Sequence, residues 1–157
     1  MQDTKTSLRT QMLERLRSTA PEERDARSVK ICERVLALPV WRRARVVAAF
    51  EPMRTEPHIG LLIDDLRTRG GELITILPSA RKDDDVAVTA PLEIVLVPGL
   101  AFTRDGGRLG RGGGFFDRFL HRRAALAISV GVCFAFQILE SLPLEAHDAR
   151  LDLVVSD

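Results

Sequence analysis

The hydrophobic residues of this chain follow two patterns: stripes at helical spacing and short uninterrupted runs. The stripes predict amphipathic helices, which cover residues 5–18, 21–37 and 57–69. The runs predict strands, which lie at residues 46–50, 73–77, 94–97, 128–133 and 151–155. Because helices and strands alternate with short connections, we expect a three-layer α/β/α fold with a mostly parallel, Rossmann-like sheet.

The limits of the second helix are marked by prolines. Pro21 is followed by two acidic residues, a combination typical of a helix start, and the helix is expected to end before Pro39. Val29 is expected on the inward face of this helix. Trp41 is expected to cover the edge of the core.

Length and charge narrow the class of protein. The 157 residues predict a single domain, 1–157, and the net charge of +1 gives no overall field that would attract nucleic acid or an anionic membrane. The start of the chain is polar, and no apolar run reaches membrane-spanning length. Cys32 and Cys133 match no metal spacing and are expected to be small buried hydrophobic residues. We therefore expect a cytoplasmic monomer or weak homodimer without nucleic-acid or membrane partners.

Glycines are concentrated in one segment, which lies just before a fourth predicted helix. Six of the eleven glycines fall within residues 106–114, together with Arg108 and Arg111. Glycine lets the backbone approach a ligand closely, and free N–H groups at the start of a helix attract anions. The arginines would add positive charge and forked hydrogen bonds. The segment therefore favours a phosphate-binding loop over a flexible connector, although it matches neither common nucleotide motif.

Other polar residues are expected at the same edge of the sheet. In an open parallel sheet, ligands bind beyond the carboxyl ends of the strands. Residues 51–56, residues 78–82 and the glycine-rich segment all follow predicted strands. The sequence thus predicts one site assembled from separate loops.

Two segments together resemble the signature of the 5-formyltetrahydrofolate cyclo-ligase family. They are Val97-Pro98-Gly99-Leu100-Ala101-Phe102 and the segment from Arg108 to Asp117, and residues 136–155 also follow the closing pattern of the family. The resemblance implies an ATP- and Mg²⁺-dependent closure of 5-formyltetrahydrofolate to 5,10-methenyltetrahydrofolate, with release of ADP and phosphate. A reduced folate and ATP would be the small-molecule partners.

The resemblance also implies roles for individual residues. Arg108, Arg111 and Asp117 are expected to act in catalysis, and Asp117 and Asp148 to bind Mg²⁺. Glu51, Glu56, Phe115 and Phe116 are expected to contact the folate. The residues expected to bind ATP are Lys5, Arg9, Arg108, Leu109, Gly110, Arg111, Gly112, Gly113, Gly114, Phe115 and Phe116.

Several alternatives remain open from the residues alone. Lys5 and Arg9 could form a solvated basic face, Glu56 could be an exposed acid before a helix, and Asp117 could only complement a helix dipole. The segment 79–91 is shorter than is usual in the family, Glu56 lacks the following Thr, and Phe115-Phe116 replaces a tyrosine pair. The chain could therefore be a shortened paralogue that binds ATP and Mg²⁺ without cyclo-ligase activity. It could also be an ATP-dependent ligase or kinase for another small heterocycle.

Overall fold

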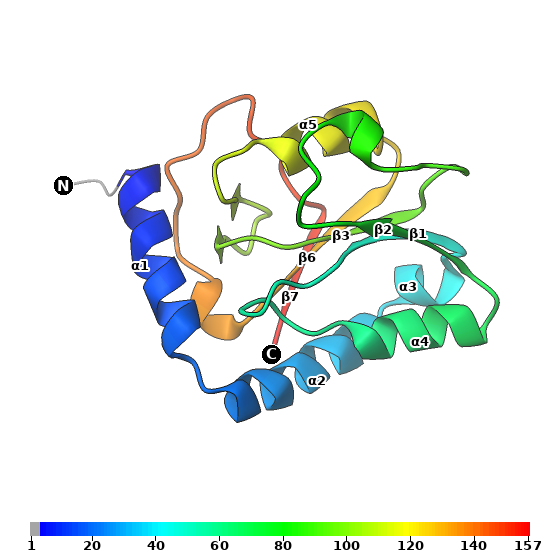
Figure 1. The fold of residues 1–157 in the computed structure, drawn as a ribbon, viewed down its shortest axis with the longest axis horizontal. Coiled ribbons are helices and arrows are strands. Elements are labelled where there is room, and N and C mark those ends of the chain that lie inside the picture. Colours follow the sequence, from blue (N-terminus) through cyan, green and yellow to red (C-terminus); the bar gives the residue numbers. More distant parts are fainter. Residues whose placement is uncertain (1–3) are drawn as a thin grey trace.

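The computed structural model describes residues 4–157 and contains a five-stranded parallel sheet between two layers (Figure 1). The strands are β1 (Val46–Phe50), β2 (Glu72–Ile76), β3 (Ile94–Val97), β6 (Ile128–Cys133) and β7 (Leu153–Ser156). Their order across the sheet is β2-β1-β3-β6-β7. The expected sheet is confirmed, with β2 and β7 shifted by one or two residues from their predicted limits.

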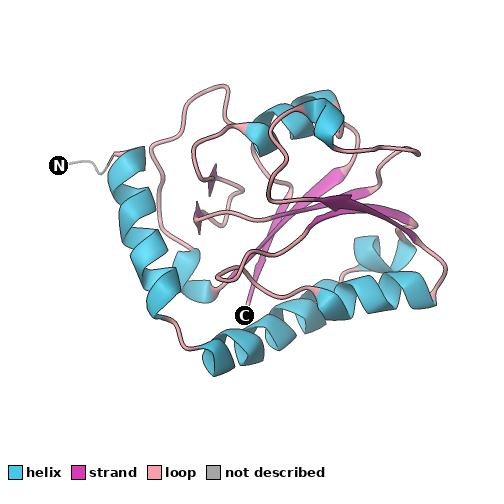
Figure 2. Cartoon of the chain, in the orientation of Figure 1, coloured by secondary structure: helices cyan, strands magenta, loops and turns pink. Residues whose placement is uncertain are grey.

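Helices cover one face of the sheet, and a helix together with a short segment covers the other (Figures 1 and 2). The first layer consists of α2 (Pro21–Leu36), α3 (Pro39–Arg43) and α4 (Gly60–Thr68). The second consists of α5 (Phe115–Arg122) and η1 (Asp83–Asp85), while α1 (Lys5–Ser18) lies beside the sheet. The three-layer prediction is therefore confirmed. None of these helices is long and apolar enough to cross a membrane within residues 4–157.

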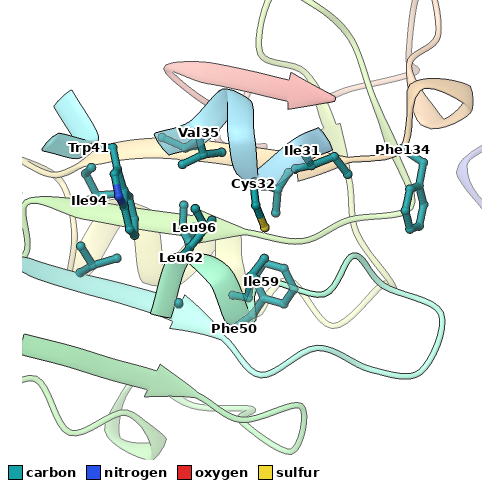
Figure 3. Packing of buried hydrophobic residues seen from close by; sticks show 14 of the residues in the cluster. Ile31, Cys32, Val35, Trp41, Phe50, Ile59, Leu62, Ile94, Leu96 and Phe134 are labelled. Atoms are coloured by element: carbon teal, nitrogen blue, oxygen red, sulfur yellow. The ribbon is translucent and has the colours of Figure 1, made fainter. Parts of the chain in front are cut away.

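The core between the sheet and the first helical layer explains the inward face of α2. Ile31, Cys32 and Val35 point toward the sheet and are almost fully buried (Figure 3). Val29 is 44% exposed, so its predicted inward position is wrong. It precedes Ile31 by two residues, about 200° around a helix, and therefore lies on a different face.

The residues after α2 and before α4 differ from the expected helix limits. Pro39 begins the short helix α3, where its fixed φ suits the first turn. Trp41 on α3 is 1% exposed, and its Nε1 donates to Asp65 Oδ2 at 2.8 Å. α4 begins at Gly60, three residues later than predicted, and the His58 N–H ahead of it donates to the Ser28 side chain at 3.0 Å.

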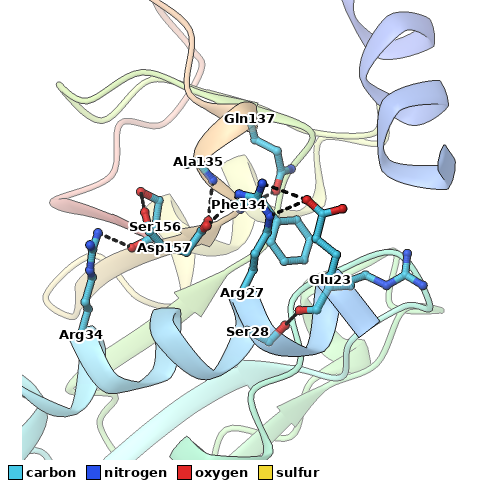
Figure 4. A network of polar contacts seen from close by, with 10 residues as sticks. Glu23, Arg27, Ser28, Arg34, Phe134, Ala135, Gln137, Ser156 and Asp157 are labelled. Atoms are coloured by element: carbon cyan, nitrogen blue, oxygen red, sulfur yellow. Dashed lines mark hydrogen bonds and ion pairs between the residues drawn. The ribbon is translucent and has the colours of Figure 1, made fainter. Parts of the chain in front are cut away.

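Polar contacts join α2 to the end of the chain at the sheet edge (Figure 4). Arg27 Nη1 lies 2.7 Å from Asp157 Oδ2, and Arg34 Nη1 donates to the Ser156 carbonyl at 2.9 Å. The other Asp157 carboxyl oxygen accepts from the Ala135 N–H at 2.7 Å. These contacts fix the edge strand β7 against α2.

The two cysteines behave as expected from their apolar neighbours. Cys32 and Cys133 are buried and form no disulfide. Burial raises the pKa of Cys32 to about 11 and that of Cys133 to about 12, so both are neutral thiols at physiological pH. They serve as small core residues.

The strand order places a crevice at the centre of the sheet. The chain winds from β1 outward to β2, then crosses back to β3 and continues the other way. The loops after β1 and β3 therefore separate at their carboxyl ends, where ligands bind in folds of this kind. A two-stranded ribbon of β4 (Ala101–Phe102) and β5 (Arg108–Leu109) follows β3 and carries the glycine-rich segment to this edge. The periodicity of the sequence did not predict this ribbon.

Candidate active site

A cavity of about 680 Å³ opens at the carboxyl ends of the central strands. Its size falls within the usual range for ligand pockets. It brings together every predicted site residue but one, from segments far apart in the chain. The predicted residues that line it are Lys5, Arg9, Glu51, Glu56, Arg108, Gly110, Arg111, Gly112, Gly113, Gly114, Phe115, Phe116, Asp117 and Asp148.

Leu109 is the predicted site residue that does not line the cavity. It is 1% exposed and belongs to the hydrophobic core. Neighbouring residues of a strand point to opposite sides, so Arg108 faces the cavity while Leu109 faces the core. A side-chain role for Leu109 in nucleotide binding does not fit this position.

The glycine-rich segment exposes main-chain donors to the cavity. The N–H groups of Arg111 to Gly114 donate to no atom among the described residues. Gly112 and Gly114 have φ values of +114° and +70°, which L residues with a side chain rarely adopt. By contrast, the N–H groups of Gly106 and Gly107 already donate to Thr103. The phosphate-binding donors predicted for 106–114 are therefore confined to the second half of that range.

Two arginines bind the carbonyl groups of the same loop. Arg9 Nε, from α1, donates to the Gly110 carbonyl at 2.8 Å. Arg118 Nη1, from α5, donates to the Gly113 carbonyl at 2.9 Å. Two carbonyls of the loop are thus occupied by cations while the N–H groups of Arg111 to Gly114 stay free, and the N-terminus of α5 lies directly behind them. This arrangement attracts anions.

Arg108 is fixed across the cavity floor. Its Nε donates to the Pro98 carbonyl at 2.6 Å, and its guanidinium carbon lies 5.0 Å from the centre of the Phe116 ring. Enclosure by protein lowers the pKa of Arg108 to about 10, although Asp117 and Glu56 oppose that shift. The side chain therefore remains positively charged at neutral pH.

Glu56 is the buried acid of the site. It is 6% exposed, and its Oε1 accepts from the Met53 N–H at 2.7 Å. Its Oε2 lies 3.9 Å from Arg111 Nη2. Burial raises the pKa of Glu56, while the Met53 N–H and two arginines act in the opposite direction. The alternative that Glu56 is an exposed acid is wrong.

Lys5 is joined to Asp148, which rules out the solvated basic face considered for the first helix. Lys5 Nζ lies 2.8 Å from Asp148 Oδ2, which also accepts from the Glu145 N–H at 2.8 Å. Burial would raise the pKa of Asp148, but these two contacts outweigh it, and the pKa is lowered. The carboxylate is thus ionised and placed beside a cation.

Asp117 and Asp148, the two residues expected to bind Mg²⁺, both line the cavity. Asp117 Oδ1 accepts from the Ala149 N–H at 3.0 Å, which links α5 to the loop that carries Asp148. Residues 4–157 contain no group of three His, Cys, Asp or Glu side chains that could hold an ion. Mg²⁺ commonly binds one or two carboxylates and completes its shell with phosphate oxygens and water. The two aspartates fit that kind of site.

Sequence reasoning missed several side chains of the cavity. Arg118 and Arg122 were not among the predicted site residues, and both line the cavity. The signal was present in the spacing: on α5, His121 follows Asp117 by four residues, and Arg122 follows Arg118 by four residues. Residues three and four apart share a helix face. Met53 and Arg81 lie in the two loops predicted at this edge, although neither was singled out, and His147 was missed.

Comparison with known proteins identifies the family. The model of the 5-formyltetrahydrofolate cyclo-ligase family matches residues 1–89 and 76–157, which together span the chain. The chain belongs to the 5-formyltetrahydrofolate cyclo-ligase family. It is 29% identical to the cyclo-ligase of Mycolicibacterium smegmatis, over 97% of this chain and 93% of that one. It is 25% identical to the mouse cyclo-ligase, over 96% of this chain and 92% of that one.

Solved structures of family members have the same fold. A 5,10-methenyltetrahydrofolate synthetase from Mycoplasma pneumoniae superposes with a TM-score of 0.84 over 99% of both chains, at 23% identity. The synthetase from Aquifex aeolicus gives a TM-score of 0.79 over 96% of this chain and 88% of that one, at 28% identity. The fold predicted from the resemblance is therefore confirmed.

The comparisons also bear on the shortness of the chain. The alignments with the mouse and M. smegmatis proteins run over 187 and 185 positions, so those relatives have residues where this 157-residue chain has none. The alignment with the M. pneumoniae cyclo-ligase runs over only 162 positions and covers 98% of both chains. A compact chain is thus found in another protein named as a cyclo-ligase.

Proposed function

We propose that this protein is a 5-formyltetrahydrofolate cyclo-ligase that uses Mg-ATP to form 5,10-methenyltetrahydrofolate. The observation that carries the proposal is the run of unoccupied N–H donors from Arg111 to Gly114, which shares one cavity with the cationic side chains of Lys5, Arg9, Arg108 and Arg111. Such a cradle suits a polyphosphate. The buried Glu56 lies across the same cavity and suits a neutral heterocycle with hydrogen-bond donors.

The proposed reaction needs activation of an amide oxygen. The γ-phosphoryl group of ATP passes to the formyl oxygen of 5-formyltetrahydrofolate, and ADP leaves. The N10 nitrogen attacks the formyl carbon, N10 loses its proton, and the C–O bond breaks with release of phosphate. Neither step requires a nucleophile from the protein, so catalysis depends on positioning and on stabilising charge.

The positive side chains would bind the nucleotide. Arg108 and Arg111 would stabilise the charge of the transferring phosphoryl group, and Lys5 would contact the phosphate oxygens nearest Asp148. Arg9 already holds the Gly110 carbonyl through Nε, which leaves its two terminal nitrogens for phosphate. Phe115 and Phe116 begin α5 beside the cradle and would pack against the substrates.

Asp117 and Asp148 would hold Mg²⁺ together with the phosphate oxygens. A bound Mg²⁺ would neutralise part of the phosphate charge and orient the γ-phosphoryl group. The Ala149 N–H positions the Asp117 carboxylate for this role. Lys5 would share Asp148 with the ion or move to the phosphates as it binds.

Glu56 would recognise the pterin. A pterin ring presents N–H donors, which a carboxylate accepts in pairs. The Met53 N–H fixes one carboxyl oxygen of Glu56, so the acid cannot rotate freely when a ligand binds. Glu51 lies on the same loop at the exposed mouth of the cavity and would add a weaker contact.

The shortened paralogue without activity is the less favoured alternative. A chain of nearly the same length carries the cyclo-ligase name in M. pneumoniae, so loss of residues is compatible with the family's function. The nucleotide side of the cavity is also complete with respect to the resemblance, except that Leu109 faces the core.

A direct assay tests the proposal. Purified protein is incubated with 5-formyltetrahydrofolate, ATP and Mg²⁺, and the methenyl product is followed by its absorbance. We expect product formation that requires both ATP and Mg²⁺, with one ADP released per product. Absence of product from a folded protein that binds Mg-ATP would favour the shortened paralogue. Hydrolysis of ATP that depends on another heterocycle would favour the ligase or kinase alternative.

A further inference from the structure

Arginines of α5 and its C-terminal end hold the segment that connects β2 to β3. Arg118 Nη2 donates to the Arg81 carbonyl and Arg123 Nη1 donates to the Asp83 carbonyl, both at 2.8 Å. Arg122 Nη1 lies 3.6 Å from Asp83 Oδ2. Charged donors form stronger hydrogen bonds than neutral ones. The segment is therefore attached to α5 mainly through its own main chain.

This segment takes the place of a helix on its side of the sheet. Ala80, Val86 and Leu92 are buried and belong to the same hydrophobic cluster as Phe119 of α5. The only helical turn in the segment is the three-residue η1. The segment is thus held both by this apolar packing and by its polar contacts with α5.

Arg118 also reaches the glycine-rich loop. Its Nη1 donates to the Gly113 carbonyl at 2.9 Å, while its Nη2 donates to the Arg81 carbonyl. One planar guanidinium thus joins two loops that line different parts of the same cavity. Lysine could not reproduce this arrangement, because its ammonium group lacks a rigid fork.

We infer that Arg118 is a positioning residue that fixes the glycine-rich loop and the segment after β2 relative to each other. Through these two hydrogen bonds, Arg118 couples the glycine-rich loop, which has the free N–H donors, to the segment after β2 on the opposite side of the cavity. The assignment of Mg-ATP and 5-formyltetrahydrofolate to these two sides rests on the proposed function. The coupling itself is a property of the protein without ligand.

Nuclear magnetic resonance of the whole chain without ligand tests the coupling. In Arg118→Ala, the ¹⁵N order parameters should fall together at Gly112–Gly114 and at Ala80–Lys82, because both loops lose the same anchor. Arg123→Ala is the matched control, since Arg123 binds the segment but does not line the cavity. It should loosen the segment alone. Unchanged order parameters of the glycine loop in Arg118→Ala would overturn the inference, as would an equal response of that loop to Arg123→Ala.

Ligand binding provides a second measurement. Arg118→Ala should raise the Kd for Mg-ATP and the KM for 5-formyltetrahydrofolate, each by about tenfold, the equivalent of one charge-assisted hydrogen bond. Added guanidinium ion should restore part of both losses, and Arg118→Lys should restore less than the native side chain provides. A lowered Tm with unchanged Kd and KM would show a merely structural residue and contradict the inference. If the native protein makes no methenyl product, the proposed function fails, while the resonance measurement still decides the coupling.

Discussion

The two sides of the cavity differ in how they carry charge. The part proposed to bind the nucleotide, called the nucleotide side, is formed by Lys5, Arg9, Arg108 and residues 110–117 and combines free main-chain donors with fixed cations. The part proposed to bind the folate, called the folate side, is formed within residues 51–56 and 77–81 and has one buried carboxyl group in Glu56. Burial of a carboxyl group costs free energy of folding, whereas exposed N–H donors at a loop cost little. Each side thus carries one charge whose burial costs stability, Arg108 on the nucleotide side and Glu56 on the folate side, whereas the free N–H donors add little to that cost.

The largest effect is expected from substitution of Asp117, the acidic residue on the nucleotide side. Asp117→Ala should lower kcat by at least about a hundredfold, the effect of removing a group that stabilises charge in the transition state. Asp117→Asn is the control for structure, because its amide oxygen can still accept from the Ala149 N–H. Both variants should lose activity under saturating Mg-ATP, and the second should keep the native Tm. Full activity in Asp117→Asn would exclude a role for the negative charge.

A methyl group placed in the cradle tests whether phosphate occupies it. A Cβ at Gly113 would meet no atom within 4 Å, so Gly113→Ala should leave the Tm unchanged. It should nevertheless weaken Mg-ATP binding by about tenfold or more, because the methyl group takes space next to the N–H donors. Gly60→Ala is the matched control, since Gly60 is equally open and lies outside the cavity. Calorimetric titration with Mg-ATP compares the two, and equal affinities would place the phosphates elsewhere.

On the folate side, Glu56→Gln should stabilise the protein while weakening substrate binding. Burial raises the pKa of Glu56, so the ionised group favours the unfolded state at neutral pH. The Tm should rise at pH 7, by roughly 2–4 °C for each kcal/mol regained. The gain should disappear as the pH falls below the ordinary glutamate pKa of about 4.3, where both states are neutral. The KM for 5-formyltetrahydrofolate should rise about tenfold at neutral pH.

Melting curves of Glu56→Gln and the native protein between pH 4 and pH 8 measure how the difference between their Tm values changes with pH. A Tm difference that grows toward acid would mean that Glu56 is stabilised as a carboxylate in the folded state. An unchanged KM would remove Glu56 from the substrate site while leaving its effect on stability intact.

The sequence predicted the nucleotide side better than the folate side, for a physical reason. Local density of glycine and arginine between residues 106 and 114 is visible without any tertiary information. Whether Glu56 is buried depends on the packing of loops distant in the chain, so its exposure could not be read from its neighbours. The same limit applies to Arg118, whose two carbonyl partners lie 5 and 37 residues away.

The sheet was predictable because each strand is an uninterrupted apolar run. β1, β3 and β6 have the predicted limits, and all three are central strands with buried residues on both faces. The short ribbon of β4 and β5 was missed, because two-residue strands carry no periodicity. Val29 was misplaced since an apolar residue on a helix can lie beside the buried face without facing the core.

The smallest expected effect concerns the turn at residues 82–85, which directly follows the folate side in the chain. Asp85 Oδ2 accepts from the N–H groups of Arg81 and Lys82 at 2.8 and 2.9 Å, whereas Asp84 is exposed and accepts no hydrogen bond among the described residues. Those N–H groups lower the pKa of Asp85, so its contribution to stability is present at neutral pH and is lost in acid. Asp85→Ala should raise the KM for 5-formyltetrahydrofolate, by no more than about fivefold because the turn is solvent-exposed. Asp84→Ala should leave the KM for 5-formyltetrahydrofolate unchanged. The KM for Mg-ATP should keep its native value in both variants. A rise in the KM for Mg-ATP in Asp85→Ala would mean that the turn affects both sides of the cavity. The two sides would then be less independent than their different charges indicate.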